Sequence, residues 1–101
     1  MTKAYVIGQI TVTNPEGYAS YASRVPATIQ AAGGQYLVRG GHTTQLEGHS
    51  QGDRQVVLAF PSRAAAEAWY HGEAYQAILP HRLQNSTGSL MVVDGYEALK
   101  A

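Results

Sequence analysis

The sequence predicts an α+β fold in which four strands form one antiparallel sheet and the helices cover one face of it. The first reason is the order of the local signals, which runs βαββαβ over residues 4–94. Because a β-α-β crossover is almost always right-handed, both helical regions should lie on the same face of the sheet. The second reason is that residues 55–60 and other strands are apolar on both faces. This arrangement is the ferredoxin-like sandwich, expected to span residues 1–101 as a single domain.

The first half of the chain predicts a strand, a helix and a second strand. Residues 4–13 are rich in β-branched side chains and end at Asn14-Pro15, a pair that suits the N-cap and the first position of a helix. Apolar residues then recur at steps of three and four until Gly33-Gly34, which predicts one amphipathic helix with a kink at Pro26. Residues 35–39 follow as the second strand.

A polar stretch separates the second strand from the third. It covers residues 42–53, and only residues 44–47 have the composition of a short strand. The pattern G-x-S-x-G occurs here at residues 48–52, but no helix follows, as a hydrolase nucleophile would require. We therefore interpret these glycines as turn residues.

The second helical region is predicted in two pieces. Residues 63–71 are rich in alanine and follow Ser62, a suitable N-cap. Gly72 interrupts the helix, and one or two further turns should end before Pro80. Residues 87–94 are the fourth strand.

Alternation along the first strand separates two sets of side chains. The purely apolar set should contact the helices: Val6, Ile10 and Val12. The other set is mixed, and we place Leu37 and Arg39 of the second strand on its side: Tyr5, Ile7, Gln9 and Thr11. Water would leave this helix-free face as a large apolar patch, which monomers rarely tolerate. We therefore expect a homodimer in which the helix-free faces of two copies pair.

Composition excludes several classes of partner. Seven Lys or Arg balance seven Asp or Glu, so the formal charge is zero. The chain lacks the basic footprint of a nucleic-acid or membrane-surface protein. There is no cysteine, which excludes disulfides and thiolate metal sites. No signal peptide or long apolar run is visible, and we expect a soluble cytoplasmic protein.

The histidines do not predict a metal site. They lack the i, i+4 spacing of a helical ligand pair and a nearby acidic partner: His42, His49, His71 and His81. There is also no glycine-rich cofactor loop, so we expect neither a metal nor a cofactor.

Two groups of residues are candidates for binding a ligand. Arg39 and His42 flank two glycines at a strand end, which suits a small anion or carbonyl site, although a plain glycine turn has the same pattern. The aromatic candidates for a pocket between helices and sheet are Tyr21, Tyr36, Trp69 and Tyr75. Core packing with bonded hydroxyls is the alternative for each of them. Arg82 follows the expected helix end, where it would cap carbonyls or neutralise a ligand carboxylate.

Seven segments resemble one bacterial protein family and together extend over nearly the whole chain. They are Tyr5–Gly8, Asn14–Tyr18, Tyr36–Gly41, Phe60–Ser62, Ala68–Tyr70, Glu73–Gln76 and Pro80–Arg82. The family is domain-of-unknown-function family 1330 (DUF 1330), in the dimeric α/β-barrel superfamily; Gly72 stands where many relatives carry serine. The resemblance implies a ferredoxin-like protomer that pairs sheet to sheet. Relatives in the superfamily include cofactor-free monooxygenases, haem-handling enzymes, muconolactone-type isomerases and ligand-binding domains without chemistry.

Two kinds of function remain open from the sequence. One is the binding or conversion of a small anionic or aromatic metabolite in a pocket between helices and sheet. The other is a non-catalytic ligand-binding or structural dimer. The chain shows no paired carboxylates at a recognisable spacing and no nucleophile beside a base, so neither an enzyme nor a non-enzyme is favoured.

Overall fold

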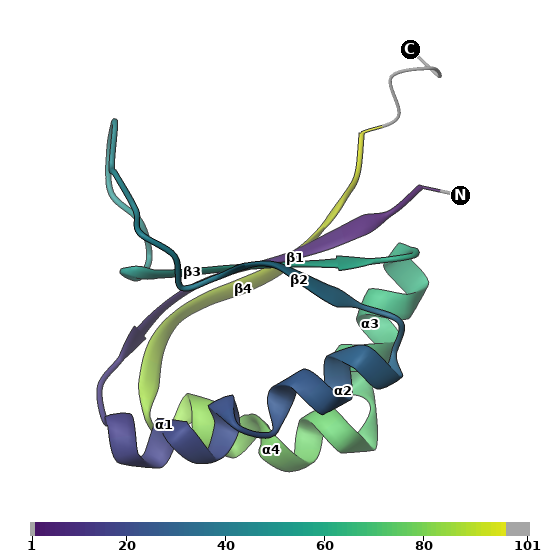
Figure 1. The fold of residues 1–101 in the computed structure, drawn as a ribbon, viewed down its shortest axis with the longest axis horizontal. Coiled ribbons are helices and arrows are strands. Elements are labelled where there is room, and N and C mark those ends of the chain that lie inside the picture. The colour runs from purple at the N-terminus through teal and green to yellow at the C-terminus, as the bar shows by residue number, and fades with distance from the viewer. Residues whose placement is uncertain (1, 97–101) are drawn as a thin grey trace.

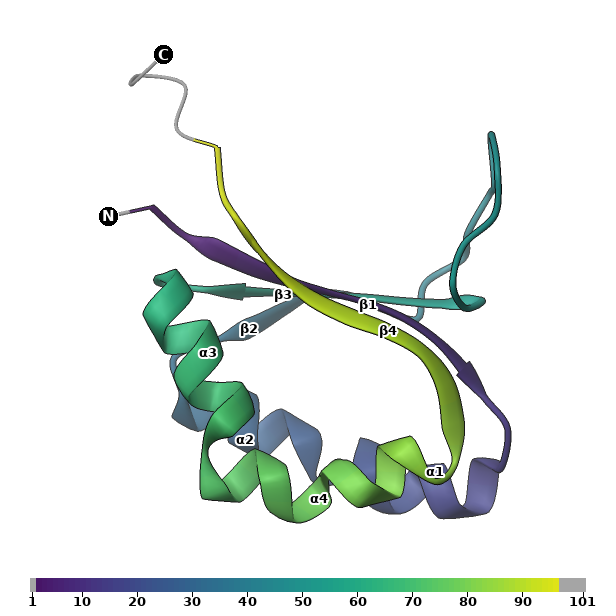
Figure 2. The ribbon, with the colours of Figure 1, turned by 180° about the vertical axis from the view of Figure 1, so that it is seen from behind.

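The structure is a computed structural model that describes residues 2–96. Four strands form one antiparallel sheet in the order β2-β3-β1-β4. Their bounds are β1 Ala4–Val12, β2 Gln35–Arg39, β3 Arg54–Phe60 and β4 Ser86–Asp94. Four helices lie on one face of this sheet, as Figures 1 and 2 show from opposite sides. The helices are α1 Pro15–Ala22, α2 Val25–Ala31, α3 Arg63–His71 and α4 Glu73–Leu83. The predicted α+β architecture is confirmed.

The first helical region contains two helices instead of one kinked helix. The chain leaves α1 at Ser23, and Pro26 lies in the first turn of α2, where its missing N–H costs nothing. The expected Asn14 side-chain cap is also wrong, because no such bond forms. Instead Asn14 Nδ2 donates to Asn85 Oδ1 over 3.0 Å, which ties the start of α1 to the segment before β4.

The prediction that the second helical region ends before Pro80 is also wrong. Helix α4 continues through Pro80 to Leu83, and Gln84 N donates to Pro80 O over 2.9 Å. Arg82 therefore lies inside a helix, with its side chain buried, and does not follow a helix end. The Ser62 cap of α3 is confirmed, since its hydroxyl accepts from Ala65 N over 3.1 Å.

Residues 40–53 leave the sheet on the side opposite to the helices (Figure 1). The predicted short strand at residues 44–47 does not form. Two side chains of β1 fix the returning segment: Gln9 Oε1 accepts from Gln51 N over 2.9 Å, and Thr11 Oγ1 accepts from Asp53 N over 3.2 Å.

The register between β2 and β3 shifts at Leu37. Tyr36 pairs with Leu58, but the next paired residue is Val38, opposite Val57. Such an extra residue reverses the alternation of the strand beyond it. Tyr36 and Arg39 consequently share the helix-covered face, and the prediction that Arg39 lies with Leu37 on the helix-free face is wrong.

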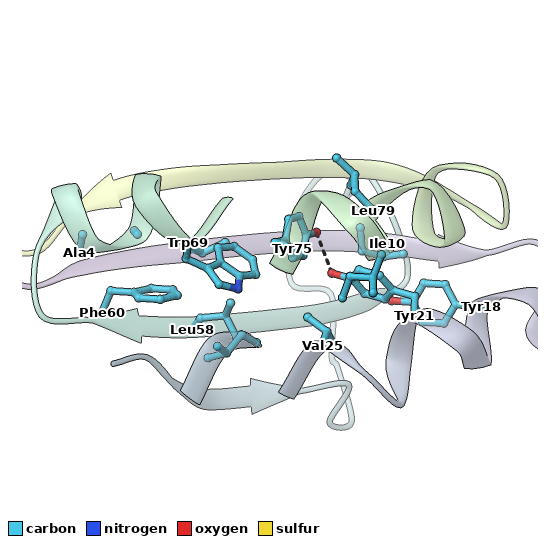
Figure 3. Packing of buried hydrophobic residues seen from close by; sticks show 14 residues of the cluster. Ala4, Ile10, Tyr18, Tyr21, Val25, Leu58, Phe60, Trp69, Tyr75 and Leu79 are labelled. Carbon is cyan, nitrogen blue, oxygen red and sulfur yellow. Dashed lines mark hydrogen bonds between the residues drawn. The ribbon is translucent and has the colours of Figure 1, made fainter. Parts of the chain in front are cut away.

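The core fills the layer between sheet and helices. Val6 and Ile10 are buried against the helices, as predicted from alternation. An aromatic cluster continues the core (Figure 3): the ring centroid of Trp69 lies 5.4 Å from that of Phe60 and 4.2 Å from that of Tyr75. The indole Nε1 donates to Thr28 Oγ1 over 3.0 Å, so it is satisfied within the protein. Across residues 2–96 no helix has the length and apolar character needed to cross a membrane.

Candidate functional site

A cavity lies between the sheet and helices α1, α2 and α4. Its empty volume is about 480 Å³, but only about 30 Å³ of that can hold the centre of a water molecule. A large empty volume with so little room for water centres describes a narrow space. Apolar side chains form much of its wall: Ile10, Val25, Ile29, Val56, Leu58 and Leu90.

Three guanidinium groups line this cavity. They come from Arg39 at the end of β2, Arg54 at the start of β3 and Arg82 in α4. Arg39 is exposed, Arg54 is half-buried and Arg82 is only 7% exposed. No Asp or Glu contributes to the lining. The cavity is therefore strongly positive in a protein whose formal charge is zero.

The acidic residues do not compensate this charge. Within residues 2–96 the ion pairs join Arg63 to Glu67 and to Asp94, on the outside of α3. None of the three cavity arginines pairs with a carboxylate in that part of the chain. An anion entering the cavity would meet positive charge that the described residues leave uncompensated.

Arg39 is placed by the break between α1 and α2. Because Pro26 has no N–H, it offers no helical donor to Ala22 O, four residues earlier. Arg39 Nη2 donates to that carbonyl instead, over 3.0 Å. Its guanidinium carbon also lies 4.8 Å from the centroid of the Tyr36 ring, within cation–π range. These contacts hold Arg39 against the cavity.

Arg82 belongs to a buried network with two tyrosines. Its Nε donates to the Tyr75 hydroxyl over 3.2 Å, and the hydroxyls of Tyr75 and Tyr21 share a hydrogen bond of 2.8 Å (Figure 3). The pKa of Arg82 is raised: burial lowers it, but the interactions with Tyr75 and Tyr21 outweigh that effect. Arg82 therefore stays a cation.

The phenols of the cavity are held neutral. Burial raises the pKa of Tyr21 far above its usual range, and the neighbouring Tyr75 adds to the effect. Burial likewise raises the pKa of Tyr18 and of Tyr36, although nearby arginines oppose it. Neutral phenols donate hydrogen bonds but do not act as bases near neutral pH.

We expect these buried phenols to make the fold sensitive to alkali. A tyrosine whose pKa is raised on folding stabilises the native state fully below its unfolded pKa of 10.0, and this contribution is lost as the pH rises beyond it. The free energy of unfolding, measured with urea between pH 7 and pH 11, should therefore fall above pH 10. Tyr21→Phe should make the fall shallower. An equally steep fall in both proteins would contradict a buried neutral phenol at position 21.

The structure brings five of the seven residues singled out from sequence into the cavity lining: Tyr21, Tyr36, Arg39, Trp69 and Arg82. Tyr75 lies directly against them through its bonds to Tyr21 and Arg82. His42 does not line the cavity. It lies in the exposed segment after β2, because the chain turns away from the sheet at Gly40, whose φ is 68°.

Sequence reasoning missed Arg54 and did not include Tyr18 in the site. The signal for Arg54 was available, since it alternates with Val56, Leu58 and Phe60 and therefore shares their helix-covered face. Tyr18 was recognisable only as an apolar position of α1. Its pKa responds to both Arg54 and Arg82, so Tyr18 lies within electrostatic reach of both cations.

Several solved structures share the fold. A protein of unknown function from Rhodopseudomonas palustris superposes with a TM-score of 0.72 at 17% identity, covering 92% of this chain and 80% of that one. SnoaB, a cofactor-independent oxygenase from Streptomyces nogalater, gives 0.64 at 12% identity and covers all of both chains. An antibiotic biosynthesis monooxygenase gives 0.53 at 16% identity, covering 97% of this chain and 99% of that one.

At such identities these likenesses establish the fold and leave the activity open. No curated protein matches the sequence. The profile of the domain of unknown function DUF1330 matches residues 3–96, which confirms the resemblance found in the sequence. This chain is therefore a member of the DUF1330 family.

Proposed function

We propose that this protein binds a small organic anion in the cavity between its sheet and its helices. One observation supports this more than any other: three guanidinium groups converge on an apolar cavity that contains no carboxylate. Burying positive charge without a counter-ion is unfavourable, and a bound anion removes that cost. Charge-assisted hydrogen bonds from arginine would then fix the anionic end of the ligand.

The shape of the cavity restricts the rest of the ligand. The space is narrow, and aliphatic side chains of β1, β3 and β4 form its sheet side: Ile10, Val56, Leu58 and Leu90. A flat apolar body fits such a space better than a thick one. Tyr18 and Tyr21 at the wall supply neutral hydroxyls as additional donors.

Conversion of the ligand is the second candidate. The lining contains no His, Lys, Asp or Glu, and the tyrosines are neutral, so the cavity has no side chain suited to remove a proton near pH 7. The three cations would instead stabilise the anion of a substrate that is itself acidic and loses its proton to water. A non-catalytic ligand-binding or structural dimer is the alternative.

We also propose that two copies associate through the helix-free face. The strand register aligns Val38, Val57, Ile7 and Met91 in one apolar row across all four strands. Val38 is 38% exposed and Met91 is 55% exposed, so this row is open to water in one chain. A second copy would cover it with an identical row, as in two-fold homodimers, and zero net charge offers little repulsion.

A thermal-shift screen tests the binding proposal. We expect organic anions from a metabolite library to raise the melting temperature, because a ligand that binds only the folded state stabilises it. Arg39→Ala should lower the affinity for such a ligand about tenfold or more, as loss of a charged hydrogen bond typically does. Its melting temperature should change little, because Arg39 is exposed.

Arg63→Ala is the matched control, since Arg63 is an exposed arginine outside the cavity. It should leave ligand affinity unchanged. Binding of anions that is equal in the wild type and in the Arg39 variant would remove Arg39 from the site. A library in which no anion shifts the melting temperature would contradict the proposed function itself.

A further inference from the structure

Arg54 has an unsatisfied donor inside the cavity wall. Its side chain leaves β3 opposite Ile10 of β1, on the helix-covered face. Its Nε is shielded from solvent and has no hydrogen-bond partner, and it is the one buried side-chain nitrogen or oxygen in residues 2–96 with this property. Buried donors without an acceptor are rare in folded proteins, and a missing ligand or ion is a frequent reason for one.

The position of the Arg54 guanidinium is defined by its neighbours. A side chain at Gly40 would collide with Nη1 of Arg54, so the guanidinium packs directly against the backbone there. The φ of 68° at Gly40 independently favours glycine. Tyr18 lies close enough that Arg54 lowers its pKa both through charge and through a hydrogen bond, against the opposing effect of burial. The group is thus held between Gly40 and Tyr18.

We propose that Arg54 is the anchor for a carboxylate group, and that the ligand is a planar aromatic or conjugated monocarboxylate. The Nε–H and one Nη–H of arginine are parallel and match the two oxygens of a carboxylate. The carboxylate supplies the acceptor that Nε lacks, after a small rotation of the side chain opens it to the cavity. This inference rests on the proposed function and specifies the ligand class and the residue that recognises it.

The narrowness of the cavity favours this class over other anions. A carboxylate conjugated to a ring is coplanar with it, so the whole molecule can occupy a thin space. A tetrahedral phosphate is thicker than that space in every orientation. The apolar residues nearest Arg54 in the sheet, Ile10 and Val56, lie beside the expected ring position.

The first test uses the wild-type protein and benzoate as the probe. In ¹⁵N-resolved NMR spectra the Nε–H signal of Arg54 should move downfield as benzoate is added, because the donor gains a charged acceptor. Benzamide has the same shape without the charge and should bind at least about tenfold more weakly. Cyclohexanecarboxylate has the charge but a thicker ring, and it should also bind more weakly than benzoate.

The second test compares Arg54→Lys with Arg63→Lys. Lysine keeps the charge but lacks the paired donors, so Arg54→Lys should weaken benzoate binding about tenfold or more and remove the assigned Nε–H signal. Arg63→Lys should bind benzoate as the wild type does. Circular dichroism melts will show that both variants fold, and the wild-type NMR titration does not depend on either variant.

The outcomes separate this inference from the proposed function. If benzoate binds and Arg39→Ala weakens it while Arg54→Lys does not, the Arg54 anchor is wrong and the anion site stands. If the library yields only phosphates or phenols and benzoate fails to bind, the carboxylate class is wrong. An Arg54 Nε–H signal that does not move on saturation with benzoate also overturns the inference.

Discussion

Trp69→Ala should lower the free energy of unfolding by about 3–5 kcal/mol, the usual cost of truncating a buried aromatic residue. Trp69 is 5% exposed, and its ring packs between Phe60 of β3 and Tyr75 of α4. Removing it also leaves the Thr28 hydroxyl without its indole donor. Since small domains have about 5–15 kcal/mol of stability in total, this variant should melt far below the wild type.

Urea unfolding followed by circular dichroism measures the loss, and Leu83→Ala is a suitable control. Leu83 is also a large apolar residue on the helical layer, but it is 60% exposed, so its truncation should change stability by less than about 0.5 kcal/mol. A Trp69→Ala protein of normal stability that had lost ligand affinity would show that the indole is mainly a wall of the cavity.

Ile7→Asp should dissociate the proposed homodimer. Ile7 lies at the centre of the apolar row on the helix-free face, paired with Val57 on one side and Met91 on the other. In the dimer an aspartate there would lose its water without gaining a cation, which is strongly unfavourable. Sedimentation velocity at micromolar concentration should give twice 10.8 kDa for the wild type and 10.8 kDa for the variant.

Gln30→Asp adds the same charge on the exposed side of α2, in the helical layer, and should leave the dimer intact. Ile7→Val keeps the face apolar and should also remain dimeric. A wild-type protein that sediments at 10.8 kDa would contradict the dimer, and an Ile7→Asp dimer would move the interface to another surface.

Much of the fold followed from local sequence signals. The order of strands and helices, the Ser62 cap and the burial of Val6 and Ile10 were all predictable, because each depends on residues within one or two turns or on simple alternation. Both the handedness of crossovers and the apolar strands predicted helices on one face. The aromatic lining by Tyr21, Tyr36 and Trp69 agrees with the pocket predicted between helices and sheet.

The convergence of the three arginines was decided by tertiary structure. The sequence placed Arg39 on the helix-free face, but the register shift at Leu37 reverses the alternation, and that shift exists only because β2 pairs with β3. Arg82 was expected beyond a helix end, yet packing of α4 on the sheet carries the helix through Pro80 and buries this side chain. His42 remained outside the cavity for the opposite reason, because the chain leaves the sheet at Gly40. Sequence alone thus determined the layers and the aromatic wall, whereas strand pairing and helix packing, which join residues far apart in the chain, determined where the charges meet.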